Sequence, residues 1–276
     1  MFKHIVLTLA VLLALSCAKD VQPEYGVQSE AVTIQYGVGV DEPVKSLGDG
    51  KTANYVWYAL YRADGSLVSA CSTPVKIDVA TGKAICPVTV AKDQNYKVVF
   101  LAMYFDNGQT MTPAYIINAQ DKIVTMPSTT QANSDKFDFF YGTDEVRNFQ
   151  SVQNGNVQLT RKVAQLNFEL TETAWNTHPV TSDFQSAITI SNVPMNFDLF
   201  TGAISGNGST TFASSAIPFE AGSRRIGTAY CFATSTGDQK IDASIRLFDQ
   251  SGTQVKTASA SDAPVAANKQ TNLIIY

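Results

Sequence analysis

The sequence predicts an all-β protein built from antiparallel β-sandwiches, and three observations support this fold class. Segments in which apolar and polar residues alternate recur along most of the 276 residues, as in strands with one buried face. Turns containing Gly, Asp or Asn separate these segments at short intervals, which is typical of β-sandwiches. Apart from short turns near residues 143–149 and 173–176, no long stretch repeats its apolar residues with the helical period.

The composition excludes several functional classes. Hydrophobic residues make up 45% and aromatic residues 10% of the chain, which is enough for packed cores and too apolar for a disordered protein. The net charge of −4 leaves no basic surplus to neutralise phosphates, so we expect no nucleic-acid partner. Of the two histidines, His4 lies in a segment expected to be removed. The remaining one, His178, cannot form a multi-histidine metal site, and we expect neither a metal nor another cofactor.

Residues 1–16 resemble a lipoprotein signal peptide. Lys3 precedes an apolar run at residues 5–15, which is shorter than the roughly 20 residues of a membrane-spanning helix. Ser16 and Cys17 then resemble a bacterial lipobox, although Ala14 stands where leucine is usual. The resemblance implies cleavage before Cys17, diacylation of its thiol (a palmitate-type anchor) and attachment to the outer membrane. An ordinary signal peptide with a chance cysteine is the alternative. Residues 17–30 are predicted to be a polar tether.

Residues 31–158 are predicted to form an N-terminal β-sandwich domain. Residues 31–40 alternate apolar side chains with Thr, Gln and Gly, which indicates a half-buried first strand. Residues 55–62 and 96–105 are apolar on both faces, and we expect the second of these to be a central strand. The other strands predicted in this half are residues 67–70, 75–79, 83–90, 110–117 and 137–141, with 75–79 and 83–90 paired as a hairpin.

Three cysteines remain after Cys17. Export favours disulfide formation, and Cys71 and Cys86 flank the predicted hairpin, so a bridge between them is one interpretation. Two buried, reduced thiols are the other. Cys231 lies on the small-residue face of a predicted strand, which favours packing over reactivity.

A change of periodicity marks the predicted domain boundary. Within residues 156–170 the apolar side chains move from odd to even positions at Arg161 and Lys162, which reverses the buried face. Either a β-bulge lies there or the chain crosses from one sandwich to another, and we favour the crossing. Residues 159–276 would then form a C-terminal β-sandwich domain, with strands at residues 185–193, 225–234, 240–249, 254–258 and 271–276.

Four segments resemble fimbrillin-family lipoproteins of the Bacteroidales. They are residues 139–142 (FFYG), 157–168 (VQLTRKVAQLNF), 193–202 (VPMNFDLFTG) and 268–273 (NKQTNL). Together with the lipobox, their order and spacing extend the resemblance over nearly the whole chain. The resemblance implies two tandem transthyretin-like (Ig-like) β-sandwich domains. Members of the family serve as stalk, anchor or tip subunits of surface fimbriae, or as related surface lipoproteins.

The resemblance also implies a route of assembly. In the family's stalk subunits a trypsin-like protease cuts after a basic residue and releases the first strand, and the groove accepts a strand of the next subunit. Here Lys45 and Lys51 are the candidate processing sites, in a loop without arginine, and two solubilising lysines are the alternative. Leu273 and Ile275 mark a candidate donor strand, whose alternative role is that of the last core strand. An unprocessed subunit would fit an anchor or accessory role.

We therefore predict a non-enzymatic, lipid-anchored cell-surface protein with a structural or adhesive role. It would be a fimbrial (pilus) subunit or accessory component that assembles by β-strand addition, and no catalytic motif contradicts this. Its expected partners are other fimbrial subunits or itself, the outer membrane, and a host protein or glycan receptor. The alternative is a surface glycan-binding lipoprotein of a polysaccharide-uptake system, using exposed aromatic residues such as Trp175. Trp57 is another candidate, although core packing suits it better.

Overall fold

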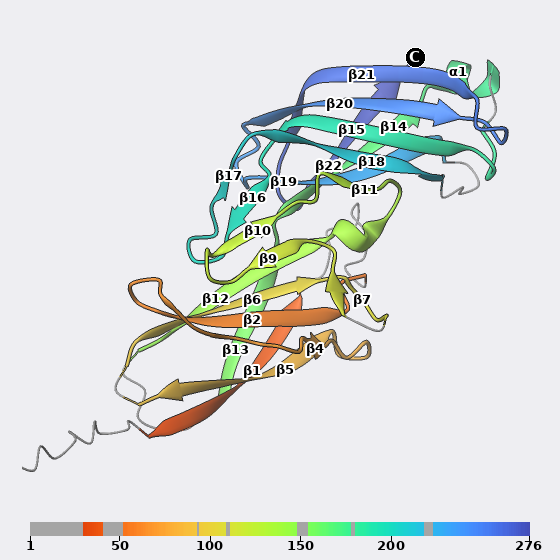
Figure 1. Cartoon of the computed structure of the whole chain (residues 1–276). Helices are drawn as coiled ribbons and strands as arrows, with labels where there is room; N and C mark the ends of the chain where they lie inside the picture. The colour runs from red at the N-terminus through yellow and green to blue at the C-terminus, as the bar shows by residue number, and fades with distance from the viewer. Residues whose placement is uncertain are drawn as a thin grey trace, which may run out of the picture.

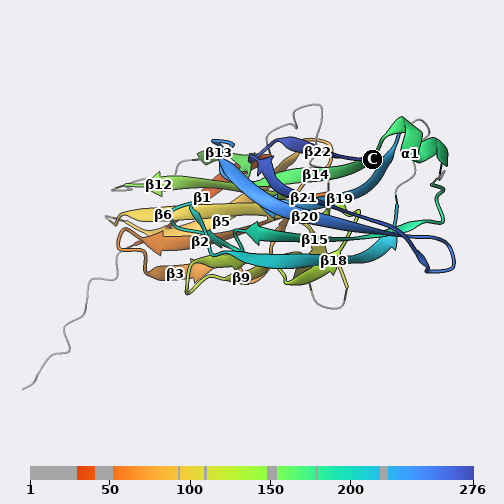
Figure 2. The ribbon, with the colours of Figure 1, turned by 90° about the horizontal axis from the view of Figure 1, so that it is seen from above.

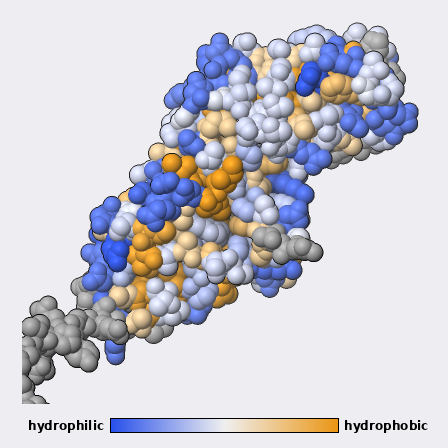
Figure 3. Space-filling model, in the orientation of Figure 1, coloured by the Kyte–Doolittle hydropathy of each residue, from blue (hydrophilic) through white to orange (hydrophobic). Residues whose placement is uncertain are grey.

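The computed structural model describes residues 30–40, 52–92, 94–108, 111–147, 154–177, 180–217 and 223–276. Cys17, Lys45, Lys51 and His178 lie outside the described residues. Within them the chain is almost entirely β-structure, which confirms the predicted fold class. Figure 1 shows an elongated molecule with the start of the first strand near one end and the C-terminus near the other, and the space-filling view in Figure 3 shows the same elongated outline. In the described part, no helix is long and apolar enough to span a membrane.

The first half of the chain forms a sheet that curls around its own core. Its eight strands are β1 (Ala31–Val40), β2 (Tyr55–Arg62), β3 (Leu67–Ala70), β4 (Val75–Lys76), β5 (Lys83–Ala91), β6 (Tyr96–Met103), β12 (Phe139–Val146) and β13 (Asn154–Arg161). Seven of them follow the order β3-β2-β6-β12-β13-β1-β5, and β4 pairs with β2. Inward side chains of β1 and β5 pack against those of β2 and β6, and this contact closes the first core.

The second half forms two sheets packed face to face. The five-stranded sheet has the order β11 (Thr129–Gln131), β18 (Gly208–Ala216), β15 (Gln185–Val193), β20 (Gln239–Phe248) and β21 (Gln254–Val265). The three-stranded sheet has the order β19 (Arg225–Phe232), β14 (Val163–Leu170) and β22 (Gln270–Ile275). Ile188 and Ile245 of the larger sheet and Phe168 of the smaller one lie in a shared core. Figures 1 and 2 place the short helix α1 (Glu172–Thr177) beside the C-terminus.

A small sheet lies between these two parts and covers the outer face of the first sheet. It has the order β17 (Ile204–Ser205), β16 (Asn196–Asp198), β10 (Ile123–Thr125) and β9 (Ile116–Asn118). The Tyr61 hydroxyl donates to the Ala119 carbonyl at 2.9 Å, and the Tyr141 hydroxyl donates to the Leu199 carbonyl at 3.1 Å. Strands β2, β6 and β12 are therefore buried on both faces, which explains why residues 55–62 and 96–105 are apolar throughout.

Strand pairing joins residues from both sides of the predicted domain boundary. β9, β10 and β11 precede residue 158, yet β10 pairs with β16 and β11 pairs with β18. Strands of the first half thus complete sheets of the second half, a long-range pairing that local periodicity does not encode. The division into residues 31–158 and 159–276 stays a prediction.

The chain crosses between the two parts at Lys162, as the change of periodicity predicts. β13 ends at Arg161 in the first sheet, and β14 begins at Val163 in the three-stranded sheet. The Lys162 N–H donates to the Phe139 carbonyl at 2.9 Å, and the Lys162 carbonyl accepts from the Ala233 N–H at 3.1 Å. One residue therefore hydrogen-bonds to strands of both parts, so the alternation reverses without a bulge between β13 and β14.

Several local expectations need correction. Residues 75–79 and 83–90 do not form a hairpin ladder, because β4 pairs with β2 and β5 pairs with β1; Asp78 and Lys83 form an isolated bridge. The predicted strand at residues 110–117 is replaced by two short strands, β8 (Thr112–Pro113), which pairs with β7 (Phe105–Asp106), and β9. Residues 143–146 continue β12 instead of turning, whereas the turn near residues 173–176 is helix α1.

Five buried tyrosines make the fold sensitive to alkaline pH. Burial raises the pKa of Tyr36, Tyr61, Tyr115, Tyr141 and Tyr230 above the usual 10.0. The unfolded chain therefore releases these protons at lower pH than the folded protein. The stability contributed by the neutral phenols is fully present below pH 10 and falls as the pH rises above it. As the pH is raised from about 8 to about 11, the urea concentration at the midpoint of unfolding should fall. An unchanged midpoint would show that the neutral phenols do not contribute to stability.

Candidate functional site

The first strand is hydrogen-bonded on both sides. β1 pairs in parallel with β13, with Val38 opposite Val157, and antiparallel with β5, with Ile34 opposite Val88. β1 alone separates β5 from β13 in the order of the described sheet. Its removal would leave two unpaired strand edges facing one another. An extended segment that offers main-chain hydrogen bonds to both edges could take its place.

Four side chains of β1 are buried, and three of them, Ile34, Tyr36 and Val38, belong to the first core. Val32, Ile34, Tyr36 and Val38 are 8%, 3%, 1% and 0% exposed. Burying one such side chain stabilises a fold by about 1.5–3 kcal/mol, so the four together contribute roughly 6–12 kcal/mol. A domain is typically stable by only about 5–15 kcal/mol. A groove emptied of β1 would therefore have to be refilled by another strand, or the first sheet would unfold.

Tyr36 is the largest of these side chains and has the most specific contacts. Its ring centroid lies 5.0 Å from that of Phe100, and its hydroxyl donates to Asp144 Oδ2 at 2.8 Å. The ring lies against Gly155 of β13, where an added Cβ would stand 2.2 Å from a ring carbon. Glycine is therefore required at position 155 to admit Tyr36. Burial, with the nearby Asp144 carboxylate, raises the pKa of Tyr36, so the phenol remains a neutral donor.

Removal of β1 would expose an apolar part of the first core, here called the β1 groove. Its walls come from β5, β6 and β13, and its lining residues are Ala84, Cys86, Val88, Val90, Val98, Phe100, Val157 and Leu159. At the start of the strand, Lys92 pairs with Glu30, whose side chain is exposed. Lys45 and Lys51 follow β1 outside the described residues, so their processing stays a prediction.

The candidate donor strand β22 is seated as the last strand of its sheet. It pairs in parallel with β14, with Leu273 opposite Phe168 and Ile275 opposite Leu170. Ile275 is 7% exposed and Leu273 is half-buried, whereas Ile274 on the other face is 49% exposed. The structure thus shows β22 in the role of a core strand, and its role as a donor stays a prediction.

The outer edge of β22 carries no charged residue and no proline. Edge strands usually carry a charge, a proline or a bulge that blocks further pairing. The edge strand β5 contains Lys83 and Pro87, and β21 contains Lys256 and Pro264, whereas β22 contains neither residue type. Between β21 and β22 lies an open groove of about 360 Å³, lined among others by Phe168, Ala258, Leu273 and Ile275.

Cys71 and Cys86 are free thiols in the structure. The Sγ atom of Cys71 accepts a hydrogen bond from the Tyr58 N–H at 3.2 Å, and Cys86 is completely buried in the first core. Burial raises the pKa of Cys71 to about 11 and that of Cys86 to about 12, with a contribution from the nearby Cys71 to the second. Both groups are therefore protonated and unreactive at neutral pH. Cys231 is also completely buried, in β19.

A disulfide between Cys71 and Cys86 stays a prediction. Alkylation of the unfolded exported protein without a reductant tests it by mass spectrometry. In the lipidated protein, whose Cys17 sulfur is blocked by the lipid, a bridge predicts that a single thiol, Cys231, is labelled, whereas three labels would rule the bridge out.

The aromatic residues do not form an exposed platform in the described part of the chain. Trp57 is 7% exposed and lies in the core, as the apolar faces of its strand predict. Trp175 lies in α1 and is half-buried against the same core, so the expectation of an exposed turn residue is wrong. Tyr276 is the sole aromatic side chain classed as exposed among the described residues. These residues also contain no group of three His, Cys, Asp or Glu side chains that could hold a metal.

Comparison with known proteins places the chain in a family. A family model described as a family of unknown function, DUF6562, matches residues 21–274. The chain belongs to the DUF6562 family. No curated protein matches the sequence.

Solved structures share the fold of this DUF6562 protein. A candidate polysaccharide-binding protein (DUF1812) of Bacteroides thetaiotaomicron is 12% identical, with 88% of this chain and 89% of that chain covered and a TM-score of 0.54. A candidate adhesin of Bacteroides ovatus is 11% identical, with 88% and 87% covered and a TM-score of 0.50. The fimbrial anchor protein Mfa2 of Porphyromonas gingivalis is 13% identical, with 88% and 91% covered and a TM-score of 0.46. The first two structures, together with the strands of this chain, confirm the all-β sandwich fold that the resemblance to Bacteroidales fimbrillin-like proteins implies.

Proposed function

We propose that this DUF6562 protein is a lipid-anchored surface protein that assembles with other subunits, or with itself, by β-strand addition. The observation that carries the proposal is the position of β1, a single strand between β5 and β13 over a continuous apolar groove. A strand that replaces β1 recovers both the main-chain hydrogen bonds and the burial of alternate side chains. The likeness in fold to a candidate adhesin is consistent with a structural or adhesive role at the cell surface.

The segment that follows β1, residues 41–51, lies outside the described residues but bears on the protein's place in an assembly. It contains Lys45 and Lys51 but no arginine. A protease that requires arginine would leave β1 in place, and an unprocessed, lipidated subunit fits an anchor or accessory position. A protease that accepts lysine would release β1 and make the protein a polymerising subunit.

A reversible lock on β1 tests the proposal. Thr33 and Thr89 face each other across β1 and β5, with their hydroxyl oxygens 3.0 Å apart on the exposed face. In the double variant Thr33→Cys/Thr89→Cys, a disulfide would hold β1 to β5 without entering the core. We expect protease-treated wild type to form oligomers, the oxidised variant to remain monomeric after the same treatment, and reduction to restore assembly. Oligomers that form equally well with the lock closed would refute strand release.

Lipid anchoring has its own test. Cys17→Ala removes the thiol that would carry the acyl chains, and two chains are needed for stable anchoring. We expect the variant to move from the membrane fraction to the soluble fraction, with the substitution Cys231→Ala as a control that leaves partitioning unchanged. Membrane partitioning that persists in Cys17→Ala would show that the anchor is elsewhere.

Binding to a glycan is the second candidate function. It is consistent with the likeness in fold to a candidate polysaccharide-binding protein. The described residues offer no exposed aromatic platform of the kind that the sequence suggested, and strand addition is therefore the better-supported function.

A further inference from the structure

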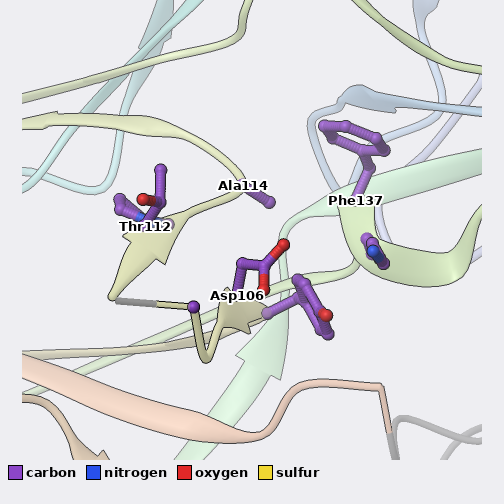
Figure 4. A pocket seen from close by; sticks show the side chains of 8 residues that line it. Asp106, Thr112, Ala114 and Phe137 are labelled. Atoms are coloured by element: carbon purple, nitrogen blue, oxygen red, sulfur yellow. The ribbon is translucent and has the colours of Figure 1, made fainter. Parts of the chain in front are cut away.

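An open cleft of about 470 Å³ lies on the first half of the molecule, away from the groove of β1. It is lined by Tyr104, Asp106, Gly108, Thr112, Pro113, Ala114, Lys136 and Phe137. Figure 4 shows Asp106 and Thr112 on the ribbon formed by β7 and β8, with Phe137 across the cleft. The cleft shares no residue with the lining of the β1 groove. Its volume is in the range of small-ligand sites, about 300–1,000 Å³.

The walls of the cleft are held by hydrogen bonds between side chains and the backbone. The side chain of Asn54 accepts from the Phe105 N–H at 2.8 Å and donates to the Phe105 carbonyl at 2.9 Å, which fixes the start of β7. The hydroxyl of Tyr115 donates to the Phe137 carbonyl at 2.6 Å and holds the short 3₁₀ helix η1 (Asp135–Phe137) on the opposite side. The cleft is therefore pre-formed, which lowers the entropic cost of binding.

The chemistry of the lining combines an apolar base with polar groups at the rim. Pro113, Ala114 and Phe137 supply apolar surface. Lys136 Nζ lies 4.5 Å from the centroid of the Tyr104 ring, a cation–π contact that positions its ammonium group. Asp106 is exposed and supplies acceptor oxygens. An ammonium donor and a carboxylate acceptor beside apolar surface match a ligand with many hydroxyl groups, because each hydroxyl can both donate and accept a hydrogen bond.

We propose that this cleft binds a neutral saccharide unit. Asp106 accepts hydrogen bonds from sugar hydroxyls, Lys136 donates to sugar oxygens, and the apolar base contacts the C–H face of the ring. This site rests on the second candidate function, binding to a glycan, and not on strand addition, because the cleft and the β1 groove have separate linings.

The test uses the full mature protein and defined sugars. The probes are methyl glycosides of glucose, galactose, mannose and N-acetylglucosamine, with glucuronic acid and N-acetylneuraminic acid as charged comparators, measured by saturation-transfer NMR and calorimetry. We expect at least one neutral glycoside to bind and Asp106→Ala to weaken it by about tenfold or more, since hydrogen bonds to charged groups are the strong ones. Lys136→Ala should also lower the affinity for the same sugar.

Matched controls separate the cleft from general effects of charge. Asp183→Ala and Lys240→Ala remove exposed charges outside the cleft and should leave the affinity unchanged. Assembly after protease treatment should be the same in Asp106→Ala as in wild type. A failure of saccharide binding can therefore be told apart from a failure of strand addition. Absence of binding by all neutral glycosides, a preference for the charged sugars, or equal affinities in cleft and control variants would overturn the inference.

Discussion

Replacing Arg161 by alanine is expected to lower the free energy of unfolding by about 3–5 kcal/mol. Arg161 Nε donates to Asp138 Oδ1 at 2.6 Å, and Arg161 Nη2 donates to Asp138 Oδ2 at 2.7 Å. The side chains of Arg161 and Asp138 are 1% and 2% exposed. Desolvation raises the pKa of Asp138 even though Arg161 opposes the shift, which shows how costly burial of this carboxylate is. Without Arg161, a buried carboxylate would remain unpaired.

The position of this ion pair explains why its loss should affect the whole molecule. Arg161 is the last residue of β13, immediately before the crossing into β14. Its Nη1 atom also donates to Asn268 Oδ1 at 3.3 Å, in the turn that precedes β22. The pair therefore links the first sheet to the C-terminal strand.

Urea denaturation of matched variants measures the effect of the pair. Arg246→Ala removes an exposed arginine and should change the free energy of unfolding by less than about 0.5 kcal/mol. The double variant Arg161→Met/Asp138→Leu replaces both charges by apolar groups and should recover most of the loss. If Arg161→Ala were as stable as Arg246→Ala, the pair would have no structural role.

Replacing Tyr36 by alanine is expected to destabilise the first sheet by about 3–5 kcal/mol, the usual cost of truncating a buried aromatic side chain. The variant loses the contact with Phe100 and the hydrogen bond to Asp144, and it leaves a cavity beside Gly155. Because these contacts hold β1 in place, Tyr36→Ala should speed the hydrogen exchange of the β1 amides relative to wild type. The amides of β14 and β19 should be affected less.

Two further variants divide the contributions to this effect. Tyr36→Phe keeps the ring but loses the hydrogen bond to a carboxylate, and should cost about 1.5–3 kcal/mol. Tyr276→Ala truncates an aromatic side chain that is 88% exposed and should be nearly neutral. Hydrogen exchange and urea denaturation of the three variants give the comparison. Equal protection of β1 in Tyr36→Ala and wild type would show that Tyr36 does not hold the strand.

The elements that local pattern determines could be predicted from the sequence. The alternation in residues 31–40 predicts β1, and the apolar faces of residues 55–62 predict a strand buried on both sides. The change of periodicity at Arg161 predicts the crossing, because it requires a reversal of the buried face. In both halves the structure adds a shared feature, a parallel pairing of the first strand with the last, β1 with β13 and β14 with β22.

The features that were missed depend on contacts between distant segments. Nothing in the local sequence of β9 to β11 indicates pairing with β16 and β18. Asp138 and Arg161 are ordinary polar residues in sequence, and only folding makes them a buried pair. The cleft joins residues 104–114 to residues 136–137 through η1, which no motif marks. The available signal was the place of Arg161, which continues the buried positions of Val157 and Leu159 along β13.

Limited trypsin digestion of the purified mature protein, followed by mass spectrometry and size-exclusion chromatography, tests strand release most directly. We expect a clean cut after Lys45 or Lys51, since these are the basic residues closest to the end of β1, and the subsequent appearance of oligomers. The released segment should be recovered as a peptide containing residues 31–40. A protein that is cut there yet remains monomeric with β1 still bound, or one that resists cleavage and never assembles, would contradict assembly through the β1 groove.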